Sequence, residues 1–188
     1  ASRDVWFVVG LPVFLRTVLG WSFWEVGGFL AIWVIGYGAV QASAPKFVRR
    51  RAAEGHGEPD GRTAALIAFV LAFFPAAIAI ALSADVDETF AIVFGLAAFG
   101  VIFAINSAVH SYLILSYSHG DKVAMNVGFY YMANAAGRLI GTLLSGLLYQ
   151  WQGLTACLWA SGIFVIAAGL LSLMLPNQRS GVKPIVGV

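Results

Sequence analysis

Six apolar stretches, most of them long enough to cross a bilayer, dominate the sequence and fix the class of fold open to it. An α-helix rises about 1.5 Å per residue, so about 20 apolar residues cross the hydrocarbon core. Apolar residues make up 60% of the chain and charged residues only 11%, and the mean hydropathy is +0.86, which is unlike a soluble domain. We therefore predict an all-α integral membrane protein with six transmembrane helices, over residues 1–19, 23–43, 63–83, 89–115, 123–149 and 154–175.

The first apolar stretch, residues 5–19, is the shortest, and it is too short to span a membrane alone. Either this helix is an incomplete span, or its first turns lie upstream of residue 1. We favour the second interpretation, in which the chain is a piece of a longer protein. It places Arg3 and Asp4 at membrane depth.

Basic residues gather on one side of the predicted bundle. They lie in the predicted loop 44–62, in the turn 116–122 and in the tail 176–188, whereas the opposite connections contain no Lys or Arg. By the positive-inside rule, the loop 44–62 and the C-terminus are cytoplasmic, in a multi-pass protein of the inner (plasma) membrane surrounded by lipid. The net charge is only +2, which gives no support for nucleic acid as a partner.

A polar stripe runs along the fifth predicted span and includes an arginine. Asn126, Tyr130, Asn134 and Arg138 are four residues apart, so they share one face of a helix. An arginine at the centre of a spanning helix costs roughly 2.5–3.5 kcal/mol on insertion scales. Such a residue is retained where it faces a wet cavity, a ligand or a partner charge, so Arg138 is the first functional candidate. The alternative is a structural role, in which Arg138 pairs with a carboxylate in the missing half of the longer protein or with carbonyl groups.

The polar residues repeat in a pattern of three spans. Spans one, two, four and five carry polar or charged side chains, whereas spans three and six carry almost none. Helices that are apolar on all sides belong against lipid, and helices with polar stripes surround a cavity. We therefore expect spans three and six to face lipid, with Ala79 and Ala167 tolerating larger apolar side chains. This order is typical of a three-helix repeat.

With this pattern, the chain resembles the carboxyl-terminal half of a major facilitator superfamily transporter over its whole length. The family carries a basic signature after the second helix of each half. Here Lys46, Arg49 and Arg50 match it, while Pro45 and Val48 replace its acidic residue and its central glycine. The resemblance implies two three-helix repeats, secondary active transport, and an N-terminal six-helix half as partner.

A narrower resemblance concerns the organoarsenical efflux transporters (the ArsJ family). It rests on the segments 3–14 and 129–138, with the downstream Gly141 and Gly146. It implies efflux of 1-arseno-3-phosphoglycerate, a small anionic organoarsenical, and hence arsenate resistance. The positive charge for its oxyanions would come from Arg138 and Arg3. Export of another small molecule by a major facilitator protein remains an alternative.

The predicted site residues follow from these patterns. Substrate binding is assigned to Arg138, Asn134, Tyr130, Arg3, Asp4 and Asn106, and proton coupling to His110 and Asp4. Each has a structural alternative: Arg3 and Asp4 neutralise each other, Tyr130 and Asn134 join helices, and His110 belongs to a polar helix end. The same alternatives describe a non-transporting six-helix membrane subunit whose polar stripe serves assembly.

No catalytic motif occurs in the sequence, so we expect no enzyme activity and no cofactor. The single cysteine, Cys157, excludes an internal disulfide and a cysteine-based metal site, and we predict no metal.

Overall fold

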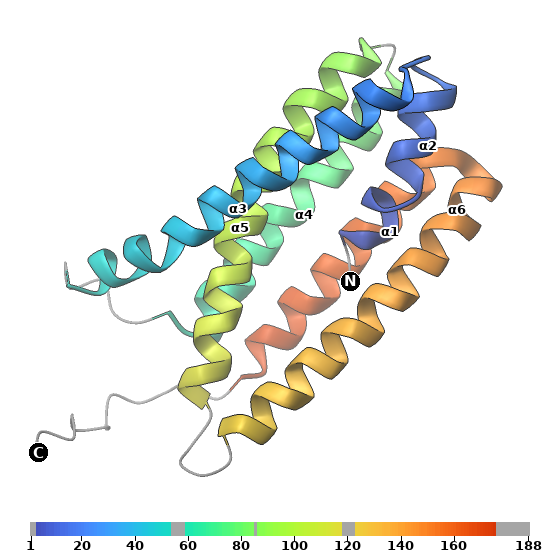
Figure 1. Ribbon diagram of the computed structural model, residues 1–188. Helices are drawn as coiled ribbons and strands as arrows, with labels where there is room; N and C mark the ends of the chain where they lie inside the picture. Colours follow the sequence, from blue (N-terminus) through green and yellow to red (C-terminus); the bar gives the residue numbers. More distant parts are fainter. Residues whose placement is uncertain (1–2, 54–58, 85, 118–122, 176–188) are drawn as a thin grey trace, which may run out of the picture.

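The computed structural model describes residues 3–53, 59–84, 86–117 and 123–175, and these form helices without a strand (Figure 1). The helices are α1 (Asp4–Phe7), α2 (Gly10–Thr17), α3 (Phe23–Ala53), α4 (Gly61–Ser83), α5 (Glu88–Tyr117) and α6 (Val123–Leu173). Within the described part, four of them, α3 to α6, are long and apolar enough to cross a membrane by length and composition. This confirms the all-α prediction and is compatible with a membrane location.

The longest helix, α6, is a hairpin of two arms, residues 123–151 and 154–173. The backbone leaves the helical region at Gln152 (φ −141°) and Gly153 (φ +69°), and the chain then runs back (Figure 1). A positive φ of this size suits glycine, which has no Cβ. The reversal lies within the turn that the sequence predicts at residues 150–153.

The segment predicted as the first span is two short helices, α1 and α2, with a break at Val8 and Val9. Pro12 explains the break, because it has no amide hydrogen for the Val8 carbonyl and its ring crowds that group. At the same break the amide of Gly10, whose acceptor in an unbroken helix would be the Trp6 carbonyl, donates instead to Ser145 Oγ of α6, 3.0 Å away. A side-chain hydroxyl thus replaces the lost helical hydrogen bond.

Helix α3 is longer than its predicted span. It begins with a capping box in which the Ser22 amide donates to Glu25 Oε2 (2.7 Å) and the Glu25 amide to Ser22 Oγ (3.3 Å). It then continues through Pro45 to Ala53. The residues after Pro45 are mostly Ala, Arg and Lys, which are strong helix formers, so the first part of the predicted loop 44–62 is helical. Residues 54–58 of that loop lie outside the described residues.

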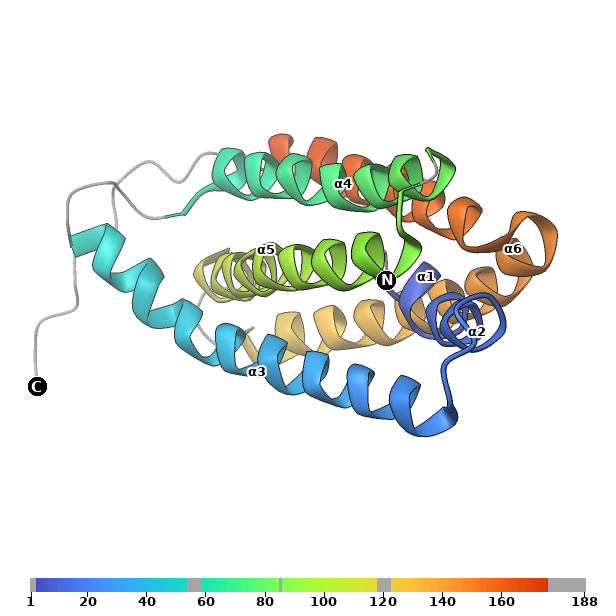
Figure 2. The same cartoon turned by 90° about the horizontal axis from the view of Figure 1, so that it is seen from above.

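The helices are arranged in layers (Figure 2). Helix α4 and the 154–173 arm of α6 pack together on one side, α3 lies on the other, and α1, α2 and α5 lie between them. The core between these layers includes Trp6, Leu11, Leu15, Leu71, Ile92, Leu96, Phe99 and Leu158. Beyond Arg62 at the start of α4, both α4 and the 154–173 arm expose large apolar side chains, among them Leu66, Phe73, Ile163 and Leu171.

The prediction for Ala79 is wrong. Its side chain is fully buried in the core, because it lies on the same helical stripe as Leu71 and Pro75, eight and four residues before it. Ala167 is exposed, as predicted. An outer helix still buries one face, and composition alone did not identify which alanine belongs to that face.

Three features lie at one end of the bundle: residues 18–22, the end of α4 with the start of α5, and the reversal of α6 (Figure 1). The first contains Gly20 with φ +71°, and Trp24 and Trp151 are among the most exposed side chains here. Exposed tryptophans at helix ends are typical of a membrane interface. Arg16 also lies near this end, where Nη1 donates to the Trp21 carbonyl at 2.9 Å. The cytoplasmic assignment of the opposite end stays a prediction.

Candidate functional site

The candidate site is centred on Asp4, an acidic side chain that is only 2% exposed. Its Oδ1 accepts hydrogen bonds from Arg3 Nη2 (2.8 Å) and Nε (3.3 Å). Its Oδ2 lies 3.6 Å from Nε of Arg138. We call these three residues the charged triad. It contains two guanidinium groups and one carboxylate, so it carries an excess of positive charge.

The triad lies at the depth of the middle of the bundle. Arg138 stands near the centre of the 123–151 arm of α6, about 20 Å from either end of that arm at 1.5 Å per residue. Asp4 reaches it from the start of α1, which packs against α6. Two predicted site segments far apart in the sequence therefore meet in one place.

The two arginines of the triad have different surroundings. The side chain of Arg3 is 18% exposed, and its guanidinium carbon lies 5.4 Å from the centres of both the Phe7 and the Phe103 rings. Cation–π attraction therefore holds Arg3 from two sides. The side chain of Arg138 is 61% exposed, so it lies at the surface of the bundle.

Behind Arg3, six aromatic side chains form a closed circuit. In order they are Trp6, Phe7, Trp33, Tyr37, Phe103 and Phe99, with neighbouring ring centres 4.5 to 6.2 Å apart. We call this set the aromatic circuit. It joins α1, α3 and α5, and Arg3 contacts two of its members. The position of Arg3 is thus fixed by packing among three helices.

Trp33 ties this circuit to the backbone of α5. Its indole nitrogen donates to the Leu96 carbonyl at 2.8 Å. A Cβ added to Gly100 would lie only 3.0 Å from that nitrogen, so glycine permits the close approach of α3 and α5 here.

Asn134 and Tyr130 lie on the same arm as Arg138, one and two turns before it. Asn134 is exposed and Tyr130 is half-buried, and the Tyr130 ring lies 5.5 Å from that of Tyr131. The predicted polar stripe therefore continues from Arg138 along the outer side of the arm. The substrate-binding assignment of these two residues stays a prediction.

Asn106 lies on α5, one turn beyond Phe103. Its Oδ1 is buried and has no hydrogen-bond partner within the described part of the chain. Nδ1 of His110 lies 2.9 Å from the Asn106 carbonyl oxygen, which can only accept, so Nδ1 donates. This hydrogen bond stays within α5 and does not join His110 to the triad. Proton coupling by His110 is untested.

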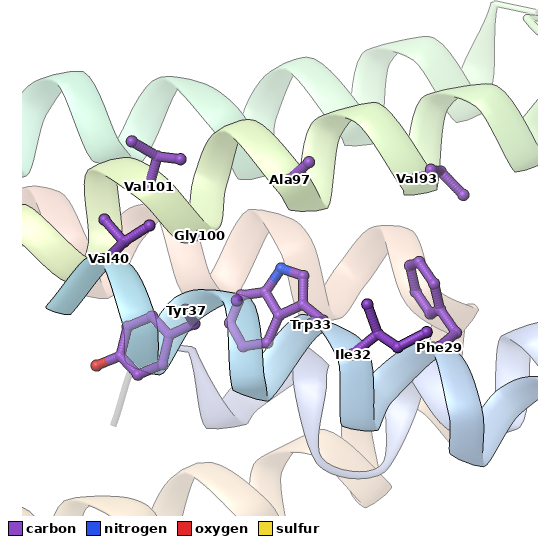
Figure 3. Close-up of a pocket in the computed structure, with 10 residues that line it drawn as sticks. Phe29, Ile32, Trp33, Tyr37, Val40, Val93, Ala97, Gly100 and Val101 are labelled. Carbon is purple, nitrogen blue, oxygen red and sulfur yellow. The ribbon is translucent and has the colours of Figure 1, made fainter. Parts of the chain in front are cut away.

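A shallow apolar groove of about 320 Å³ runs between α3 and α5, next to the aromatic circuit (Figure 3). Trp33 and Tyr37, whose rings are stacked 5.5 Å apart, form part of its wall together with Phe29, Ile32 and Val40. The smaller residues Ala97 and Gly100 of α5 leave the space open. No charged side chain lines the groove among the residues that the structure places there, so it does not suit an anion.

Where the chain is described, no three His, Cys, Asp or Glu side chains come together as a metal site would require. Cys157 is buried, and its Sγ lies 3.5 Å from the Ser145 carbonyl, so it serves packing beside the α1–α2 break. The side chains of Lys46, Arg49 and Arg50 lie outside what the structure describes; their backbone forms the end of α3.

The aromatic contacts of Arg3 were not predicted from the sequence. Phe7 lies four residues after Arg3, a spacing that places both on one face of a helix. The sequence therefore contained an indication of that contact. Phe103 had none, because its contact depends on how α5 packs against α1.

Comparisons with known proteins give no identification: no family model matches the chain, and neither a curated protein nor a solved structure matches it.

Proposed function

We propose that the chain is one half of a secondary active transporter of the major facilitator type, which exports a small anion from the cell. The observation that carries this proposal is the charged triad, in which the buried Asp4 faces two arginines, and one of these, Arg138, lies midway along a membrane-length arm of α6. Charge at that depth is expensive and is usually functional. An excess of positive charge there favours a negatively charged ligand.

The order of the helical segments supports the transporter class. In the proposed arrangement, the α1–α2 segment, α3 and α4 form one three-helix repeat, and α5 with the two arms of α6 forms the second. The third member of each repeat, α4 and the 154–173 arm, packs on the same side of the bundle (Figure 2). Six spans in two such repeats are expected of half a major facilitator transporter.

The exposed side of α6 supports a partner in the membrane. Arg138 and Asn134 are exposed on an arm that also exposes Phe129, Met132 and Leu139. A guanidinium facing lipid would be costly, so this side should face a water-filled cavity closed by another set of helices. We propose that the N-terminal six-helix half of the same transporter supplies them.

The proposed substrate is an anionic organoarsenical, 1-arseno-3-phosphoglycerate, as the resemblance to organoarsenical exporters implies. The planar guanidinium of Arg138 can bind two oxygens of a phosphate or arsenate group at once. Asn134 and Tyr130, on the same stripe, would offer hydrogen bonds to the hydroxyl and carbonyl oxygens of the ester.

The test is arsenic accumulation in transporter-deficient cells that make the arsenate ester and express the full-length protein. Wild type should lower cellular arsenic only when the ester pathway is present. Arg138→Gln should abolish this effect with similar protein in the membrane, because Asp4 keeps its 2.8 Å pair with Arg3. Arg138→Lys should retain part of it, because lysine keeps the charge and loses the planar fork.

Arg16→Gln is the matched control. Arg16 is also an exposed arginine of the bundle, but it binds the Trp21 carbonyl and lies 4.8 Å from the Phe23 ring at the end of the bundle. Its loss should leave export unchanged. Full export by Arg138→Gln would refute the anion site. If wild type exports nothing and Arg138→Gln instead dissociates a complex on native gels, the chain is a non-transporting subunit.

A further inference from the structure

The two oxygens of Asp4 are held unequally by the two arginines. Arg3 donates to Oδ1 from Nη2 at 2.8 Å, the length of a charge-assisted hydrogen bond, and from Nε at a longer 3.3 Å. Nε of Arg138 is 3.6 Å from Oδ2, which is too long for a hydrogen bond. Of the two arginines, Arg3 is thus the close partner of Asp4 and Arg138 the loose one.

The arginines also differ in how freely they can move. Arg3 lies between Phe7 and Phe103, within a set of rings packed across three helices. Arg138 is 61% exposed, so rotation of its side chain would not disturb the core. The close partner is fixed and the loose one is free to rotate toward the cavity proposed above.

We propose that Asp4 is the resident counter-anion of Arg138, and that a phosphate- or arsenate-bearing ligand displaces it when it binds. In this arrangement Arg3 is a positioning residue: it stays with Asp4 and does not touch the ligand. The proposal rests on the proposed anion site at Arg138 and adds that the ligand and Asp4 compete for the same guanidinium.

Competition predicts that loss of the Asp4 carboxylate strengthens anion binding, whereas direct binding by all three residues predicts that it weakens binding. Without its carboxylate, Asp4→Asn leaves Arg138 without this competitor, so the anion should bind more tightly. Arg3→Met removes the close partner of Asp4, so Asp4 should hold Arg138 more strongly and the anion should bind more weakly. In the double variant Arg3→Met/Asp4→Asn, the competitor is absent again and binding should be tighter than in wild type.

The experiment measures the affinity of the purified full-length protein for 3-phosphoglycerate, a stable phosphate ester, by titration calorimetry in detergent, with glycerol as the uncharged control. Asp4→Asn should lower the Kd about tenfold or more, as expected for one unit charge a few ångströms from the ligand. Arg3→Met should raise the Kd. An unchanged or higher Kd in Asp4→Asn overturns the proposal.

Asp4→Asn strands two arginines, and breaking a buried ion pair can prevent folding. If its melting transition is absent, the double variant decides, because it removes both partners of the close pair. A Kd below that of wild type supports the competition, and an equal or higher Kd refutes it. Arg138→Gln separates the two proposals: if it binds the ester as wild type does, or if wild type binds none, the anion site itself is wrong.

Discussion

The amide nitrogen of Gly10 donates a hydrogen bond to Ser145 Oγ, 3.0 Å away, and both residues are buried. The two residues are 135 positions apart in the sequence. This contact joins the break between α1 and α2 to α6, seven residues beyond Arg138. It therefore helps to hold the α1 segment, with Asp4 at its start, beside the arm that carries the arginine.

Ser145→Ala should destabilise the protein by about 1–3 kcal/mol, because it leaves the buried Gly10 amide without its acceptor. Ser161 is the matched control, since it is equally buried on α6 and its Oγ has no hydrogen-bond partner in the described part of the structure. Ser161→Ala should be neutral or slightly stabilising. Denaturant unfolding in detergent measures both, and equal losses for the two variants would contradict the assigned role of Ser145.

The crossing of α4 and α5 requires a glycine at position 95. A Cβ added there would lie 2.5 Å from Cγ1 of Ile78, which is itself buried. Gly95→Ala should therefore cost about 1–3 kcal/mol by overpacking. Gly146→Ala is the control, because a Cβ at Gly146 meets open space.

A double-mutant cycle distinguishes overpacking at this crossing from a general loss of packing. Ile78→Ala alone should cost about 2–5 kcal/mol through its cavity, but it also makes room for a methyl group at position 95. The double variant should therefore lose less unfolding free energy than the sum of the losses in the two single variants. Strict additivity would show that Gly95 and Ile78 are not in contact.

The start of α4 depends on Asp60, which caps the helix. The backbone amide and the hydroxyl of Thr63 both donate to Asp60 Oδ1 at 2.8 Å, and these hydrogen bonds hold the pKa of the Asp60 carboxyl below its usual value. Asp60→Ala should cost about 0.5–2 kcal/mol at neutral pH.

The lowered pKa of Asp60 also determines whether its contribution to stability rises or falls with pH. The Asp60 charge contributes to the free energy of unfolding at pH values above the pKa of an aspartate in the unfolded chain, about 3.9. This contribution is lost as the pH falls through the lower pKa that Asp60 has in the folded state. Asp60→Asn keeps a capping oxygen and does not titrate. The difference in unfolding free energy between wild type and Asp60→Asn should therefore shrink as the pH falls below about 4, and a difference that grows would refute the assignment.

Helices α4 and α5 were predictable from the sequence because each depends on a local signal. Runs of apolar residues place α4 and α5 within two residues of their observed bounds, and Gly20 and Gly153 mark turns through their positive φ. The charge of Arg138 likewise predicted a partner or ligand. The structure gives it a carboxylate within the same chain, Asp4, at 3.6 Å.

What could not be predicted depends on packing between distant segments. The aromatic circuit needs α1, α3 and α5 in contact, and no spacing in the sequence pairs Phe103 with Arg3. The burial of Ala79 follows from which face of α4 meets the core. The second span was predicted to end at residue 43, but the helix formers after Pro45 continue the helix to Ala53.

The ends of α4 provide a direct test of membrane topology. Arg62 and Val86 are both exposed: Arg62 lies in the first turn of α4, and Val86 follows its other end. The helix has 23 residues and is about 35 Å long. If Lys and Arg mark the cytoplasmic side, a cysteine at position 86 should react with an impermeant maleimide added outside intact cells, and a cysteine at position 62 only after the cells are opened. The background is Cys157→Ser, since the native thiol is buried. The reverse labelling would invert the topology, and labelling of both positions from outside would show that α4 does not cross the membrane.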